Sequence, residues 1–161
     1  MLGRSKIGTA LKLTALSLAA TALIGCSSPE QKVAKYVAKG QEYLTAGDLV
    51  KARIEFQNAL QIDPNKLEAL SALADIAERN RDWPRLFALL SKVAELDAKN
   101  PKAHVRLAKL LLAAGDLKRA NESVSAALTL SPNDPDVMTL QAALLLKSGD
   151  GKGAADWANK A

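Results

Sequence analysis

The chain has 161 residues, of which 22 are Lys or Arg, 17 are Asp or Glu, one is His and one is Cys. The single cysteine excludes an internal disulfide, and one histidine with one cysteine provides too few ligands for a zinc site. Three basic residues and no acidic residue lie in the first 12 positions, so the rest of the chain has a net charge of only +2. The basic composition therefore gives no support for nucleic-acid binding, which needs a clustered basic face.

Residues 1–25 have the layout of a secretory signal. The basic residues Arg4, Lys6 and Lys12 are followed by an uncharged, apolar run from Leu13 to Gly25. A helix of this length would reach about 20 Å, which is shorter than the roughly 30 Å hydrocarbon core of a bilayer. The run is therefore predicted to be a cleaved signal peptide and not a membrane-spanning helix.

The only cysteine, Cys26, follows this run directly. The stretch Leu23-Ile24-Gly25-Cys26 resembles the lipobox of bacterial lipoproteins. The resemblance implies a diacylglycerol thioether on Cys26 and cleavage before it, and Ser27 resembles the outer-membrane address of such proteins. We expect residues 26–32 to be the lipidated cysteine and a short tether, with the protein on the outer membrane and facing the periplasm. The alternative is a free thiol or a buried small apolar side chain.

The remainder of the chain contains an internal repeat. "LTAGDLVKARIEFQNALQIDP" begins at Leu44, and "LAAGDLKRANESVSAALTLSP" begins at Leu112; the two align without a gap at an offset of 68 residues, twice 34. A weaker copy begins at Glu78, midway between them, and a further start occurs at Leu146. Alanine and leucine dominate, which favours helices. The period predicts stacked units of two helices each.

A period of 34 residues resembles the tetratricopeptide repeat (TPR). The resemblance implies an all-α, TPR-type α-solenoid of helix-turn-helix repeats after the lipoprotein signal, with units at 33–66, 67–100 and 101–134 and a partial unit at 135–161. Because the last unit stops early, we expect the sequence to be the N-terminal part of a longer repeat protein. The residues that carry the resemblance include Tyr36, Gly40, Tyr43, Gly47, Ala52, Phe56, Ala59, Pro64, Leu107, Ala108, Gly115, Ala120, Ala127 and Pro132.

Turn signals recur with the repeat. Gly-Asp pairs at 47–48, 115–116 and 149–150 predict a left-handed glycine that ends one helix and an aspartate that caps the next. Small residues every 34 positions predict a close approach of the two helices of each unit; they are Gly40, Ala74, Ala108 and Ala142.

The second unit departs from this pattern. Asn80-Arg81 replaces the turn glycine, and Leu86 replaces a small alanine. We expect Asn80 to take the left-handed conformation at some cost, and the helix pair to be wider or shifted. Trp83 is expected to be buried in the resulting gap rather than to bind a ligand.

The sequence contains no recognisable catalytic or cofactor-binding motif. His104, the only histidine, is expected to be half-buried against the partner helix and not to act as a base or metal ligand. The recurring aspartates are explained by helix capping. We therefore predict that the protein is not an enzyme and binds no cofactor or metal.

A solenoid exposes a long concave surface, and the resemblance implies that the first helix of each unit lines it. The candidate partner-binding residues are Gln41, Asp75, Glu78, Lys102, Arg106 and Lys109. Their signs alternate between units, which suits an extended peptide or a helix rather than a polyanion. The alternative is an ordinary solvated face.

The resemblance implies a membrane-anchored scaffold that binds another protein of the bacterial cell envelope and no nucleic acid. The stretch "VKARIEFQNALQIDPN" resembles the repeat lipoproteins of exopolysaccharide export and PEP-CTERM sorting systems. One alternative is a pilotin-like lipoprotein that assists assembly of a pilus secretin. Another is a non-catalytic regulator of cell-wall enzymes.

Overall fold

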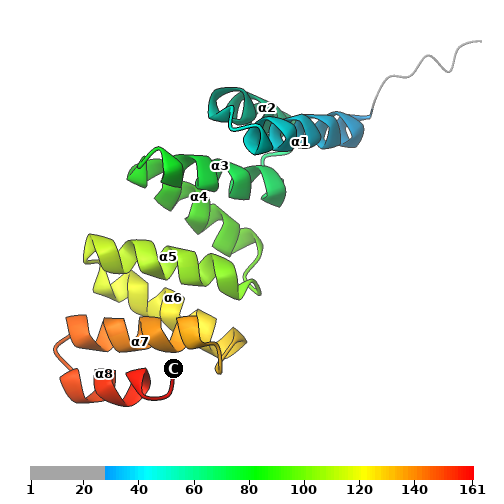
Figure 1. Cartoon of the computed structure of the whole chain (residues 1–161). Helices are drawn as coiled ribbons and strands as arrows, with labels where there is room; N and C mark the ends of the chain where they lie inside the picture. Colours follow the sequence, from blue (N-terminus) through cyan, green and yellow to red (C-terminus); the bar gives the residue numbers. More distant parts are fainter. Residues whose placement is uncertain (1–27) are drawn as a thin grey trace, which may run out of the picture.

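The computed structural model describes residues 28–161, and this part of the chain forms eight α-helices and no strand. Consecutive helices pair as antiparallel hairpins that stack one on the next (Figure 1). The predicted all-α solenoid of helix-turn-helix units is confirmed. The helices are α1 (Pro29–Thr45), α2 (Leu49–Ile62), α3 (Leu67–Arg79), α4 (Trp83–Leu96), α5 (Pro101–Ala114), α6 (Leu117–Leu130), α7 (Pro135–Lys147) and α8 (Gly151–Ala158).

The stack has two different edges. The tight turns within the hairpins lie along one edge, on the left in Figure 1, and the longer connections between hairpins lie along the other. The second helix of each hairpin packs against the first helix of the next, so the core runs the length of the stack. This arrangement follows from the repeat, because each unit can bury its apolar face only against its neighbours.

Small residues allow the two helices of a hairpin to approach closely. Ala74 and Ala108 on first helices and Ala52 and Ala120 on second helices are completely buried. Gly40 is also buried and lies against the ring of Phe56. The predicted close approach is therefore confirmed at these positions.

Aspartate caps and left-handed residues build the four tight turns. The side chains of Asp48, Asp82, Asp116 and Asp150 each accept a hydrogen bond from a backbone N–H three residues on, which satisfies a free donor of the helix N-terminus. Gly47, Gly115 and Gly149 have φ of +80°, +77° and +90°. Both expectations are confirmed for the Gly-Asp turns.

The first helix begins earlier than expected. The predicted unit starts at Val33, whereas α1 starts at Pro29. A capping box explains the difference: the Ser28 hydroxyl accepts from the N–H of Gln31, and the Gln31 side chain accepts from the N–H of Ser28. Proline at the first helical position adds to this signal. Residues 29–32, which were assigned to the predicted tether, are therefore the first turn of α1.

The turn of the second unit differs from the prediction. Asn80 has ordinary right-handed dihedrals, and Arg81 takes the left-handed conformation, with φ of +55°. Arg81 stands 34 residues from Gly47 and from Gly115, so it occupies the glycine position of the repeat. Helices α3 and α4 still form a normal hairpin. The wider spacing is instead between first helices: α3 and α5 have no Cα atoms within 8 Å of each other, whereas α5 and α7 do.

Candidate partner-binding surface

The six candidate residues all lie on first helices, as expected. Gln41 is on α1, Asp75 and Glu78 are on α3, and the other three are on α5. Gln41, Glu78, Lys102 and Lys109 are exposed, and Asp75 and Arg106 are half-buried. Their role in binding a partner stays a prediction, but the structure shows which of them interact with one another.

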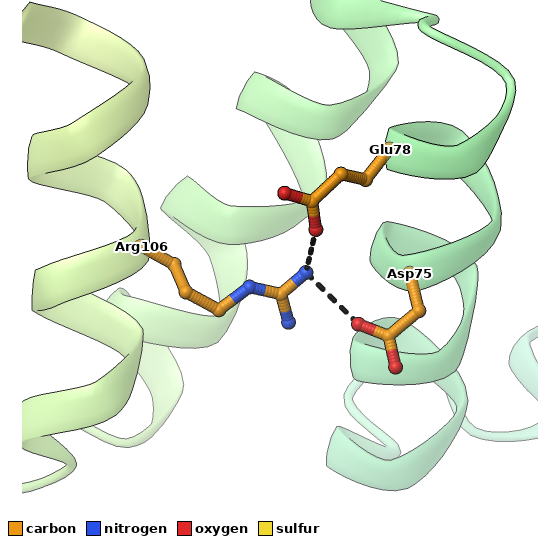
Figure 2. A network of polar contacts seen from close by, with 3 residues as sticks. All are labelled: Asp75, Glu78 and Arg106. Atoms are coloured by element: carbon orange, nitrogen blue, oxygen red, sulfur yellow. Dashed lines mark hydrogen bonds and ion pairs between the residues drawn. The ribbon is translucent and has the colours of Figure 1, made fainter.

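Arg106 connects the second and third units. Its Nη2 atom lies 2.9 Å from Asp75 Oδ1 and 2.9 Å from Glu78 Oε2 (Figure 2). The two carboxylates are three residues apart on α3, so they lie on one face of that helix. The guanidinium group thus joins α5 to α3, although no Cα atoms of these two helices lie within 8 Å of each other.

Lys109 makes a second connection between units, this time from α5 to α7. Its Nζ atom lies 3.4 Å from Oδ2 of Asp136, which is in the first turn of α7. The sequence reasoning missed Asp136, because it paired no charges across units. Asp136 lies 27 residues beyond Lys109, and Arg106 lies 28 residues beyond Glu78, so each pair joins the first helices of consecutive units.

Four of the six candidates therefore pair with charges of a neighbouring unit. These pairs connect consecutive first helices, and a charged partner would have to compete with them. Lys102 and Gln41 lie outside this network: Lys102 forms no ion pair within residues 28–161. Gln41 lines a shallow hollow on α1 together with Ala38, Glu42, Thr45 and Ala46.

His104 and Trp83, which are not among the six candidates, were expected to be at least partly buried. His104 is half-buried, as predicted, and its Nε2 atom lies 3.1 Å from the carbonyl oxygen of Ala98. The expectation for Trp83 is wrong, because the side chain is 51% exposed. Trp83 is the first residue of α4, at the edge of the stack, where Leu49 and Leu117 in other units pack against the core.

Within residues 28–161 no group of three or more His, Cys, Asp or Glu side chains is arranged to hold a metal ion. In the same part of the chain, no helix has the length and hydropathy needed to cross a bilayer. Cys26 and the predicted signal peptide lie outside the described residues.

The repeat architecture defines the class of this protein as an α-solenoid. Residues 36–66 and 87–144 match sequence profiles of the tetratricopeptide repeat. With the eight stacked helices, these matches show that the chain is a TPR protein, and TPR domains are protein-interaction scaffolds.

The chain is similar to solved structures of MamA proteins. One is 20% identical, with a TM-score of 0.74 over 81% of this chain and 72% of that chain. MamA from Desulfovibrio magneticus RS-1 is 19% identical, with a TM-score of 0.68 over 82% and 72%. Anaphase-promoting complex subunit 3 of Schizosaccharomyces pombe is 26% identical over 98 residues, which are 61% of this chain and 15% of that subunit. At these identities the structural likeness shows the fold alone.

Proposed function

We propose that this protein is a lipid-anchored TPR scaffold that binds another protein of the bacterial cell envelope. The observation that carries the proposal is the combination of a repeat solenoid with a lipobox-like sequence immediately before it. The folded part begins at Ser28, two residues after Cys26. A tether of that length spans under about 10 Å, because an extended chain reaches at most about 3.5 Å per residue. The solenoid would thus be held at the membrane surface.

The proposed location is the outer membrane, with the solenoid in the periplasm. Ser27 supports this location, because it stands where lipoproteins retained at the inner membrane commonly carry aspartate. The proposed pathway is exopolysaccharide export or protein sorting, supported by the resemblance of the first repeat. A pilotin-like role with a pilus secretin, or regulation of cell-wall enzymes without catalysis, are the alternatives for the same anchored scaffold.

The anchor is tested by Cys26→Ser in the full chain. We expect the wild-type protein to sediment with membranes and to remain there after a high-salt wash, because acyl chains contribute about 0.8 kcal/mol per buried CH₂. The variant should lack the acyl chains and appear in the soluble fraction once its leader has been removed. Gly115→Ala, in the same chain, is a matched control that leaves the leader intact and should stay with the membranes. A Cys26→Ser protein that resists the salt wash would contradict the anchor.

The binding role is tested separately by photo-crosslinking in cells. A benzophenone amino acid at Gln41 or Lys102, both free of the ion-pair network, should crosslink to an envelope protein. The same group at Glu122, on an exposed position of the second helix α6, is the control. Equal crosslinking from all three positions would contradict a concave binding surface.

A further inference from the structure

The edge that carries the tight turns is strongly basic. The four windows 45–53, 79–87, 113–121 and 147–155, which are spaced by one repeat, contain nine basic and four acidic side chains, a net charge of +5. The corresponding windows on the opposite edge, 28–36, 62–70, 96–104 and 130–138, contain five basic and six acidic side chains. The charge difference between the edges is present in the folded stack, because the tight turns all lie on one side (Figure 1).

The acidic groups of the basic edge are already occupied. All four are the N-cap aspartates, each of which accepts a hydrogen bond from a helix N–H. Asp48, Asp82 and Asp116 also pair with Lys51, Arg85 and Arg119. The remaining cations have no anionic partner within 4.0 Å in the described part of the chain; on this edge they include Arg79, Arg81, Lys118, Lys147 and Lys152. These cations are therefore available to form ion pairs with an external anion.

The turn between α3 and α4 has residues that differ from those of the other three turns and that do not stabilise the fold. Arg81 takes a left-handed conformation that costs an L-residue about 1–2 kcal/mol, at a position where the other three turns have glycine. Trp83 exposes half of its surface at a position where two other units have a packed leucine. Arg79 adds a further exposed cation two residues before Arg81. Strained residues of this kind commonly mark functional sites.

We infer that the α3–α4 turn, with Arg79, Arg81 and Trp83, is the docking site for an acidic segment of a protein partner. The inference rests on the proposed function as a protein-binding scaffold and names the chemistry of the partner. Arginine binds carboxylates with two parallel hydrogen bonds, and tryptophan and arginine are the residues that dominate the energy of protein interfaces. A carboxylate-rich segment with an apolar side chain would pair with the guanidinium groups and pack on the Trp83 ring.

An acidic protein segment suits this turn better than an anionic lipid surface does. A membrane would contact the whole edge, but a tryptophan beside two unpaired arginines, Arg79 and Arg81, occurs at this turn only. The other three windows contain four lysines, two arginines and no tryptophan. Arginine at a planar, bidentate site also differs in function from lysine, which acts as a point charge. Anionic vesicles are therefore included in the test as a competing ligand.

The test uses the full chain in detergent with Trp157→Phe, so that Trp83 is the only tryptophan. The probe is a synthetic peptide of alternating Asp and Glu with one central Leu. We expect saturable binding with a blue shift of the Trp83 emission, and weaker binding at high salt. Arg81→Gly should lower the affinity about fivefold while leaving the fold at least as stable, because glycine relieves the left-handed strain. Trp83→Ala should lower it about tenfold.

Lys118→Ala is the matched control, because Lys118 is an exposed and unpaired cation on the next turn of the same edge. Its affinity for the peptide should stay within about twofold of the parent. Arg81→Gly with unchanged affinity would overturn the inference. So would equal binding of a peptide with Asn and Gln in place of Asp and Glu, or saturable binding to phosphatidylglycerol vesicles without binding to the acidic peptide.

Crosslinking distinguishes this inference from the proposed function. A benzophenone amino acid at Trp83 in cells should capture a protein, and mass spectrometry should place the crosslink in a segment rich in Asp and Glu. Crosslinks from Gln41 or Lys102 without any from Trp83 would overturn the inference and leave the scaffold intact. The absence of crosslinks from all three positions would overturn both.

Discussion

Gly40 lies so close to Phe56 that there is no room for a side chain. A Cβ atom built on Gly40 would stand 2.7 Å from Cε1 of the Phe56 ring. The ring is 1% exposed and belongs to the core between the first two units, so it has little freedom to move. This contact fixes the separation of α1 and α2.

We therefore predict that Gly40→Ala destabilises the protein, although alanine is the better helix former by about 1 kcal/mol. Overpacking of a filled core costs about 1–3 kcal/mol and should exceed this gain. Chemical denaturation followed by circular dichroism measures the change. Gly151→Ala is the control, because a Cβ there meets no atom within 4 Å. Adding Phe56→Leu to Gly40→Ala should recover part of the loss, and a stabilised Gly40→Ala protein would contradict the packing argument.

Arg81→Gly should have the opposite effect on stability. The left-handed conformation of Arg81 is strained for an L-residue, and glycine adopts it freely. We expect the free energy of unfolding to rise by about 1 kcal/mol, reduced slightly because glycine also makes the unfolded chain more flexible. Gly115→Ala, at the equivalent turn of the next unit, should lower it by a similar amount. A destabilised Arg81→Gly protein would mean that the arginine side chain contributes more to the fold than its exposure suggests.

Much of the fold could be predicted because the signals that define each repeat lie within a short stretch of sequence. The Gly-Asp turns and the small residues at 34-residue spacing act within one hairpin, so a single sequence contains the information. The start of α1 at Pro29 was also readable, since Ser28, Pro29 and Gln31 form a recognised capping pattern. This capping pattern precedes the repeat register, which begins at Val33, so the period alone does not indicate it.

The parts that could not be predicted depend on contacts between units. Nothing in the periodicity indicates that Arg106 reaches two carboxylates on α3, since this depends on the distance between α3 and α5. The exposure of Trp83 was missed for a similar reason: its position in the repeat indicates packing, but the local path of the α3–α4 turn leaves its ring at the surface. The candidate residues lie on first helices, whereas their charge pairing required the structure; their role in binding a partner stays a prediction.

Stability should fall in acid because of the capping aspartates. The backbone N–H of Arg119 and then its side chain donate hydrogen bonds to Asp116, which lowers the pKa of this carboxyl below its ordinary value of 3.8. A folded-state pKa below the unfolded one stabilises the fold above the unfolded pKa, and the effect is lost as pH falls through the folded pKa. The pKa of Asp48 is also lowered, first by the side chain of Lys51 and then by its backbone N–H.

We therefore expect the free energy of unfolding to decrease below about pH 4. Asp116→Asn retains a good N-cap but removes the titrating group, so its stability should depend less steeply on pH in this range. Denaturation titrations between about pH 2 and pH 7 measure the slope. An unchanged slope for Asp116→Asn would contradict the assignment.

The Arg106 network should contribute a coupling that depends on salt. Its guanidinium group contacts Asp75 and Glu78 from a different unit, but its side chain is 32% exposed, which limits the Coulomb energy. A double-mutant cycle with Arg106→Ala on one side and Asp75→Asn with Glu78→Gln on the other should give a coupling of about 0.5–1 kcal/mol. Raising the salt concentration to 1 M should reduce it, since the Debye length then falls to about 3 Å. Lys102→Ala, on the same helix but outside the network, should show no coupling to the α3 carboxylates. If the Arg106 coupling were also zero, the first helices of the second and third units would be held only by their apolar contacts, and these charges would be free to bind a partner.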